Sequence, residues 1–275
     1  MIHPHDLNIF LDSGAFSAWT RGTEIDIDEY CEYIRANIEH LEVYASLDVI
    51  PGSPVKPATK NDRDSAASQS WKNYLYMKEQ GLNPIPVYHY GEHFKWLDNM
   101  LEYGCEYIGI GGLVGLSTPI RKQWLDQVFT AITDQDGKPI VKTHGFGMTA
   151  IPLIFRYPWY SVDSIAWIRV AQNGGIYFPK TDKSKEFMFD TTPVALAVSK
   201  DSPAMKKEGK HYKSLGPASV EIVKKWLDFC GTCIDEVESN YHYRALVNAT
   251  YFKMVAEKRK DSRFDRHSIK HSGLL

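Results

Sequence analysis

The sequence has few cysteines, no long apolar run and no large excess of charge of either sign. Its 4 cysteines, at positions 31, 105, 230 and 233, are too few and too scattered for a disulfide framework in 275 residues. This scarcity favours a reducing compartment and predicts a cytoplasmic location. No apolar run approaches the roughly 20 residues that span a bilayer, so we expect no membrane contact. The N-terminus has neither a basic start nor a long apolar core, and we expect no secretory signal peptide.

The near balance of charge excludes a polycation. The formal net charge is −2, so any contact with nucleic acid must come from a local patch. One such patch is the basic stretch over residues 258–271, which includes Arg263 and Arg266. A charge run of this kind is either a solvated tail or an arm that contacts phosphates, and the sequence leaves both readings open.

The chain does contain an alternation of short apolar runs and helical stretches over its first two thirds. Hydrophobic residues make up 43% of the sequence, enough for one large domain. The expected strands are 7–12, 43–49, 84–90, 107–111, 139–144, 160–164 and 174–179. The expected helices are 27–41, 61–80 with Asn61 and Asp62 as its N-cap pair, 92–103, 118–132 and 149–157. This alternation predicts an α/β fold with a parallel sheet. Seven strands favour a TIM-like (β/α) barrel over the alternative, an open doubly wound sheet.

The alternation stops near residue 180. Residues 180–214 are rich in Lys, Asp, Ser and Pro and predict a long loop, with a hairpin at 187–189. Residues 217–237 and 241–259 predict two helices. We therefore expect a barrel core over residues 1–180 and a C-terminal helical extension over 181–275, which is part of the same domain.

Polar and glycine residues follow the C-terminal ends of the expected strands. Asp12, Asp48 and Asp163 come at such ends, as do His89 and His144. Two glycine clusters lie in the same kind of place, at 109–115 and 145–147. In a barrel the strand ends form one rim, so these residues are expected to converge on a single pocket.

The glycine pair at 111 and 112 has two readings. It lacks the spacing of a dinucleotide fingerprint and has no P-loop lysine. It either brings backbone amides close to a flat ligand, such as a nucleobase edge, or forms a tight strand-to-helix turn.

Four short motifs, in the same order, resemble those of the tRNA-guanine transglycosylases, and more closely their phage and bacterial relatives that insert 7-deazaguanines into DNA. The segment DSGAF at 12–16 resembles the family's DSGGF, and IGGLVG at 110–115 resembles its GGLAVG. HGFG at 144–147 resembles its MGVG, and VDS at 162–164, with Arg169 and NG at 173–174, resembles its FDC, TR and NG. The resemblance runs from about residue 7 to 180, and SGAFSAW at 13–19 is similar to the DNA-modifying branch.

The resemblance implies a pentosyltransferase that exchanges guanine for a 7-deazaguanine base through a covalent Asp-glycosyl intermediate. Asp163 would be the nucleophile at the sugar C1′, and Asp12 the general acid and base for the leaving and entering bases. Retaining glycosidases also use two carboxylates, one on either side of the glycosidic bond that is broken. The target base must leave its stack to enter such a pocket.

The same resemblance implies how the base and the polymer are held. Asp48 matches the aspartate that accepts from the exocyclic amine and ring N–H of the purine, and His89 falls where the family carries a glutamine. The expected base-binding set is Asp48, His89, Gly111, Gly112, Leu113 and Gly145. The expected nucleic-acid-binding set is Arg169, beside the phosphate of the reacting nucleotide, with Lys180, Arg263 and Arg266 from the loop and the tail.

The sequence departs from the family at both ends. Only eleven residues precede Asp12, so we expect the family's usual first strand to be missing and the barrel to be closed by another segment or left open. The family's zinc site has three cysteines and a histidine. Here Cys230 and Cys233 supply two cysteines, Val247 stands at the histidine position, and His242 would fit only with a changed geometry. We therefore expect no metal and no other cofactor.

These departures favour DNA over tRNA as the polymer. The small-molecule partner would be a 7-deazaguanine such as 7-cyano-7-deazaguanine. If the chain is phage-encoded, its location would be the host cytoplasm. A homodimer would be in keeping with the family. Three alternatives stay open: the same exchange on tRNA, a non-catalytic nucleic-acid-binding barrel, and an unrelated metal-dependent hydrolase that uses His89, His144 and Asp163. Retention of both Asp12 and Asp163 argues against the non-catalytic barrel.

Overall fold

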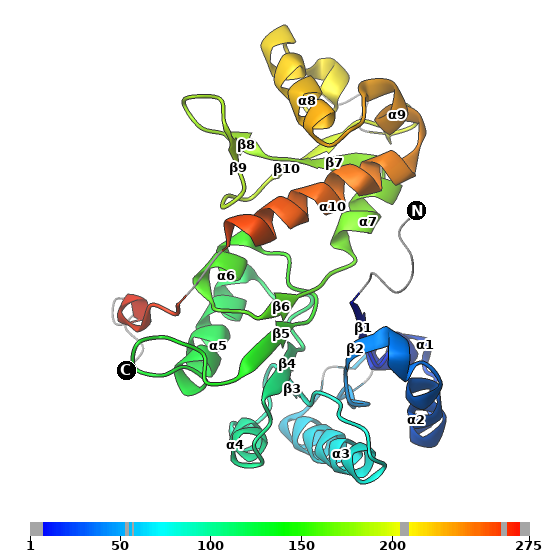
Figure 1. Cartoon of the computed structure of the whole chain (residues 1–275), viewed down its shortest axis with the longest axis vertical. Helices are drawn as coiled ribbons and strands as arrows, with labels where there is room; N and C mark the ends of the chain where they lie inside the picture. The colour runs from blue at the N-terminus through cyan, green and yellow to red at the C-terminus, as the bar shows by residue number, and fades with distance from the viewer. Residues whose placement is uncertain (1–7, 53–54, 57, 204–208, 260–262, 270–275) are drawn as a thin grey trace. The chain divides into compact units, whose positions relative to one another are not determined.

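The computed structural model describes residues 8–52, 55–56, 58–203, 209–259 and 263–269 (Figure 1). The chain divides into two compact units. The first unit comprises residues 1–146 and 159–162, and the second comprises residues 147–158 and 163–275. The boundary expected from the sequence, at residue 180, lies later in the chain than this division.

The first unit is built on parallel strands that follow one another in chain order. They are β1 (Ile9–Leu11), β2 (Leu41–Tyr44), β3 (Val87–His89), β4 (Tyr107–Gly111), β5 (Lys142–Gly145) and β6 (Ser161–Val162). β1 pairs with β2, and β3 to β6 form a four-stranded sheet in the order β3-β4-β5-β6. A parallel bridge between Ala45 and Ile85 joins the two sheets, because Ser46 N–H donates to Ile85 C=O at 2.8 Å. The parallel α/β arrangement predicted from the sequence is therefore confirmed for this unit.

Helices connect these strands. α1 (Ala15–Arg21), α2 (Ile27–Ala36) and the short 3₁₀ turn η2 (Ile38–His40) lie between β1 and β2 in the chain. α3 (Lys60–Glu79), α4 (Lys95–Glu102) and α5 (Thr118–Ala131) provide the next three connections. The N-cap of α3 is Thr59, not the predicted pair Asn61 and Asp62. Thr59 Oγ1 accepts from Asp62 N–H while Asp62 accepts from Thr59 N–H, a reciprocal capping box that starts the helix one residue earlier.

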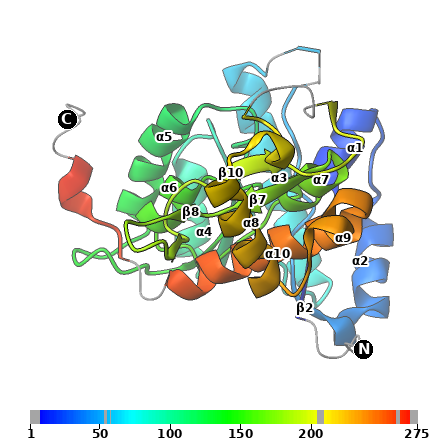
Figure 2. The ribbon, with the colours of Figure 1, turned by 90° about the horizontal axis from the view of Figure 1, so that it is seen from above.

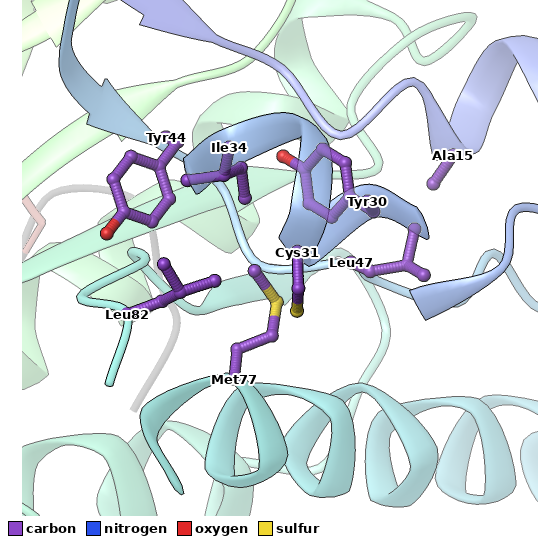
Figure 3. Packing of buried hydrophobic residues seen from close by; sticks show 8 residues of the cluster. All are labelled: Ala15, Tyr30, Cys31, Ile34, Tyr44, Leu47, Met77 and Leu82. Atoms are coloured by element: carbon purple, nitrogen blue, oxygen red, sulfur yellow. The ribbon is translucent and has the colours of Figure 1, made fainter. Parts of the chain in front are cut away.

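One hydrophobic cluster packs α2 and α3 against β2 (Figure 3). Tyr30, Cys31 and Ile34 are the buried residues of α2, and their spacing of one helical turn gives the helix a single apolar face. Met77 of α3 points toward this face in Figure 3. The Tyr30 hydroxyl donates to Ala45 C=O at 2.9 Å, so the polar group of this buried ring has a partner.

A second cluster lies on the opposite face of the strands, and its rings show that the sheet curves. Ala45, Ile85 and Val87 form it, with Phe10, Val43, Tyr107 and Phe146 packed against them. The Phe10 ring of β1 stacks on the His144 ring of β5, with centroids 4.1 Å apart, although β2, β3 and β4 lie between these strands in the sheet order. Among the described residues, no strand pairing joins β1 to β6.

The second unit combines helices with antiparallel strands. Its elements are α6 (Ile151–Arg156), α7 (Ala166–Gln172), β7 (Gly175–Phe178), β8 (Lys180–Thr181), β9 (Phe187–Met188), β10 (Val194–Ala197), η4 (Tyr212–Ser214), α8 (Pro217–Phe229), α9 (Ile234–Ser239), α10 (Tyr241–Lys258) and η5 (Arg266–Ile269). α10 packs along α7 and β7 (Figures 1 and 2). Buried Asn248 fixes this packing, since its side chain accepts from Tyr177 N–H at 2.5 Å and donates to Trp167 C=O at 2.8 Å.

Three predictions fail in this unit. β7 is not a parallel barrel strand, because it pairs antiparallel with β10. The stretch 180–214 is not one long loop, since β8, β9 and β10 lie in it, although the hairpin predicted at 187–189 is confirmed as β8-β9. The helix predicted over 217–237 is two helices, because Gly231 adopts the left-handed conformation (φ +74°) between α8 and α9. Within the described parts of the chain, no helix has both the length and the apolar character that crossing a bilayer requires.

Candidate functional site

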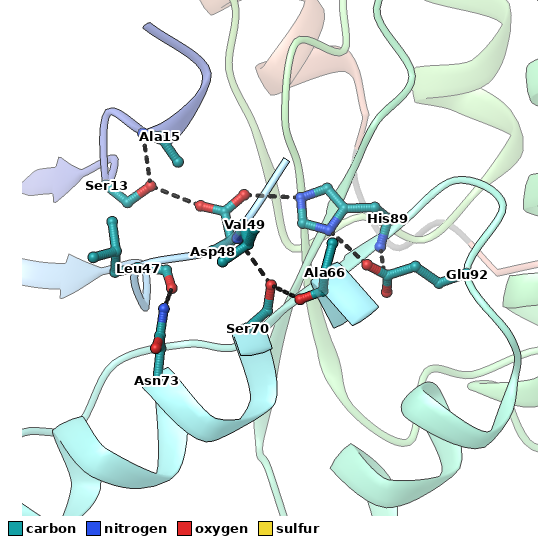
Figure 4. A network of polar contacts seen from close by, with 10 residues as sticks. All are labelled: Ser13, Ala15, Leu47, Asp48, Val49, Ala66, Ser70, Asn73, His89 and Glu92. Carbon is teal, nitrogen blue, oxygen red and sulfur yellow. Dashed lines mark hydrogen bonds and ion pairs between the residues drawn. The ribbon is translucent and has the colours of Figure 1, made fainter. Parts of the chain in front are cut away.

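A buried polar network in the first unit joins the ends of β1, β2 and β3 (Figure 4). Its centre is the carboxylate of Asp48, four residues beyond β2. Ser13 Oγ donates to Asp48 Oδ1 at 2.7 Å, and His89 Nε2 lies 2.8 Å from Asp48 Oδ2. Ser13 Oγ in turn accepts from Ala15 N–H at 3.2 Å at the start of α1. Both oxygens of Asp48 are thus held by side chains from other strand ends.

A second carboxylate, Glu92, holds the other side of the His89 ring. His89 Nδ1 lies 3.0 Å from Glu92 Oε1, and His89 N–H donates to Glu92 Oε2 at 3.1 Å. The Glu92 side chain is only 2% exposed and that of His89 only 6%, so water does not compete for these contacts. The imidazole therefore sits between two carboxylates, with each ring nitrogen facing one of them.

This arrangement decides the charge of each group. Burial alone would lower the pKa of His89, but hydrogen bonds and opposite charges from Asp48 and Glu92 outweigh it and raise the pKa to about 10. Burial alone would raise the pKa of Asp48, but His89 and the Ser13 hydroxyl outweigh it and lower the pKa below its usual value. At neutral pH His89 is an imidazolium that donates from both nitrogens, and Asp48 is ionised although it is almost buried.

α3 holds the backbone that presents Asp48. Ser70 Oγ accepts from Val49 N–H at 2.9 Å, and Asn73 Nδ2 donates to Leu47 C=O at 2.8 Å (Figure 4). The peptide groups on either side of Asp48 are therefore fixed by one helix. Such support reduces the freedom of the carboxylate, as binding of a flat, hydrogen-bonding ligand requires.

The structure gives the expected base-binding glycines a packing role. A Cβ at Gly111 would lie 2.9 Å from Cδ2 of His89, so the missing side chain makes room for the imidazole ring. Gly112 has φ +73°, and a Cβ there would lie 2.9 Å from Tyr90 N. Leu113 is buried, and Gly145 pairs with Ile110 and Val162 inside the sheet. These contacts support the tight-turn reading of the pair at 111 and 112.

A second polar group lies on the curved inner face of the first unit. Ser161 Oγ is 2.6 Å from His144 Nδ1 and 2.5 Å from the Tyr107 hydroxyl. His144 is buried and stacked on Phe10, so its side chain packs in the interior on this face of the sheet. No group of three His, Cys, Asp or Glu side chains in the described ranges is placed to hold a metal ion.

The two cysteines considered for zinc are in different surroundings. Cys230 is buried at the end of α8, and burial raises the pKa of its thiol to about 12. Cys233 is exposed and caps α9, where its N–H donates to Glu236 at 3.1 Å.

The expected nucleophile and phosphate-binding residues all lie in the second unit. Asp163 is exposed and directly follows β6, and its Oδ1 accepts from Gly147 N–H at 2.8 Å. Arg169 on α7, Lys180 in β8 and Arg263 are exposed, and Arg266 in η5 is half-buried. The expected acid and base, Asp12, is exposed directly after β1 in the first unit.

The structure thus brings Asp48 and His89 together and adds two residues that sequence reasoning missed. Ser13 lies within the DSGAF motif, so its hydroxyl was available as a signal. Glu92 follows His89 by three residues, a spacing that suits a turn closing on itself.

A scan against protein-family models and a search of curated proteins both return no match to this chain.

Proposed function

We propose that the chain is a transglycosylase that exchanges guanine in DNA for a 7-deazaguanine base. The observation that carries the proposal is the ionised, nearly buried carboxylate of Asp48, held by Ser13 and His89 at a strand end. The resemblance of the motifs at 12–16, 110–115 and 162–164 to the guanine transglycosylases assigns base recognition to this position. A fixed carboxylate suits the adjacent N–H donors of a guanine edge, which are a ring N–H and an exocyclic amine.

His89 and Glu92 would act here as positioning residues. The imidazolium keeps Asp48 ionised, and an ionised carboxylate accepts two hydrogen bonds where a protonated one would donate a proton. Glu92 fixes the ring and offsets its charge. The glutamine found in the family at this position supplies hydrogen bonds without charge. In this chain the imidazolium of His89 would supply the hydrogen bond together with a positive charge.

The proposed reaction has two displacements. Asp163 Oδ attacks C1′ of the target nucleotide, the C1′–N9 bond breaks, and Asp12 protonates the departing guanine. The entering 7-deazaguanine loses its N9 proton to Asp12, attacks C1′, and breaks the bond to Asp163. The carboxylate and the acid are regenerated, and the configuration at C1′ is retained. We further propose that β1–β6 form an incomplete (β/α) barrel, which the chain-order pairing and the stacking of Phe10 on His144 support.

The test is incorporation of radiolabelled guanine into plasmid DNA and, separately, into bulk transfer RNA. We expect label in DNA for the wild type and for Asp136→Asn, a control that removes an exposed carboxylate from a loop of the first unit. Asp163→Asn should lower the rate by several orders of magnitude, because the amide cannot form the covalent intermediate.

Each other outcome is informative. Label in transfer RNA alone would retain the mechanism and overturn the DNA substrate. A second arm follows release of labelled guanine from DNA when 7-cyano-7-deazaguanine is added. Binding of DNA without exchange in either arm would favour the non-catalytic barrel, and exchange by Asp163→Asn at the wild-type rate would overturn the nucleophile.

A further inference from the structure

A basic cleft of about 530 Å³ opens in the first unit beside the buried network. It is lined by Lys60, Asn61, Arg63, Asp64, Gly91, Glu92, His93, Phe94 and Lys95. Glu92 belongs to both the cleft and the buried network, because it lines the cleft and contacts His89. The cleft is therefore next to the residues proposed to recognise the base.

The charges of the lining leave two cations without a carboxylate partner. Lys95 Nζ lies 2.8 Å from Asp64, which also accepts from Trp96 Nε1 at 2.9 Å, and Glu92 shares the imidazolium of His89 with Asp48. Within the described residues, neither Lys60 nor Arg63 forms an ion pair. Two unneutralised cations at one cleft attract an anion.

The Arg63 side chain lies against the turn after β3. Gly91 has φ +84°, and a Cβ there would lie 3.2 Å from Arg63 Nη1 and 3.3 Å from its Cδ. The absence of a side chain at Gly91 thus lets the guanidinium lie against the backbone. An ordered guanidinium loses less entropy when it binds a phosphate than a free one does.

Two further residues suit a nucleotide chain. His93 Nδ1 accepts from Lys95 N–H at 3.1 Å, so a neutral ring carries its proton on Nε2, a donor for a phosphate oxygen. Phe94 supplies an apolar surface of the kind on which a base or sugar packs.

We propose that this cleft binds the phosphodiester backbone of a nucleic-acid strand, with Lys60 and Arg63 each contacting one phosphate. The inference rests on the proposed function and extends it, because it assigns a phosphate site to the unit that holds Asp48. The strand would then be gripped next to the base that has left the stack.

The experiment measures binding of a fluorescein-labelled single-stranded DNA 20-mer by anisotropy over a series of salt concentrations. Each phosphate contact in single-stranded DNA adds about 0.7 to the slope of log K against log salt, so Lys60→Gln with Arg63→Gln should lower the slope by about 1.4. The control pair Lys72→Gln with Lys138→Gln removes the same charge from exposed positions outside the cleft and should leave the slope unchanged. The charge-preserving pair Lys60→Arg with Arg63→Lys should have the same slope as the wild type.

The inference is overturned if the cleft pair and the control pair give the same slope. It is also overturned if inorganic phosphate raises the melting temperature of the wild type but not of the cleft variant while the DNA slope stays unchanged, since the cleft would then take a free anion. Binding is measured without base exchange. A reduced slope without any exchange would refute the proposed function alone, and exchange with an unchanged slope would refute this inference alone.

Discussion

His89 keeps its proton between two carboxylates that are both removed from solvent. Its ordinary pKa is 6.5, and its pKa in the folded protein is about 10. The folded chain therefore binds this proton more tightly than the unfolded chain. The resulting stabilisation is complete below about pH 6.5 and is lost as the pH rises toward 10. For Asp48, whose pKa is lowered from 3.8, the stabilisation is present above that value and is lost as the pH falls.

Comparison of the wild type with His89→Gln tests this linkage. The difference in unfolding free energy should be largest between about pH 4 and 6.5. It should then fall by up to about 1.4 kcal/mol per pH unit as the pH rises toward 10. Urea unfolding at pH 5.5, 7.5 and 9.5 measures it. A difference that is constant over this range would mean that His89 does not hold the proton.

Two glycines on one face of β4 offer a matched pair of substitutions. Gly111→Ala places a methyl group 2.9 Å from the His89 ring, whereas Gly109→Ala places one 2.6 Å from Cε2 of Phe146. Both should destabilise the first unit by about 1–3 kcal/mol through overpacking. Only Gly111→Ala should lower the pKa of His89 in an NMR titration of its ring protons, because it displaces the ring from Asp48. Equal shifts in the two variants would contradict the packing role of Gly111.

At the scale of residues, the sequence identified Asp48 and His89 but not how they are paired. Both lie at the C-terminal ends of expected strands, so their place at one sheet edge was predictable. Their charges depend on Ser13 and Glu92, which approach from a different strand and from the following turn. Spacing along the chain does not encode such contacts, and it left open whether Gly111 faces a ligand or belongs to a tight turn.

Among the elements, α10 depends most on a single side chain. Asn248 is fully buried and pairs with the backbone of β7 and of α7. Asn248→Ala would remove the hydrogen bonds to Tyr177 N–H and Trp167 C=O and leave the partly buried Tyr177 N–H without this partner, at a cost of about 1–3 kcal/mol. Leu246→Ala on the same helix removes a side chain that is 44% exposed and should change stability by less than about 0.5 kcal/mol. Thermal unfolding of the two variants should separate them clearly, and similar melting temperatures would contradict the anchoring role.

Elements were predictable where local signals define them. The prediction for β4 matches the structure at both ends, and α10 begins at the predicted residue because Asn240 caps it and accepts from His242 N–H. β7 was placed correctly along the chain, but its direction of pairing was not, since the partner strand β10 lies in the stretch 180–214, which was predicted to be a loop. Pairing direction is a property of two segments, and the pattern of one segment does not contain it.

For the whole molecule, composition predicted one large domain of nearly balanced charge, and the alternation of apolar runs and helical stretches predicted an α/β fold. It did not predict two compact units, because helices and short strands alternate in both and no linker-like segment separates them. The overall charge of −2 also conceals the local excess of cations at Lys60 and Arg63. Function in this chain has to be sought in such local features.

The path of the chain between the units has a practical consequence. It leaves the first unit after residue 146, returns at 159 and leaves again after 162. No single breakpoint in the gene separates the two units, since a fragment ending at 162 still carries α6 of the second unit and a fragment starting at 147 still carries residues 159–162 of the first. A crossover at one site would therefore always divide at least one of the two units.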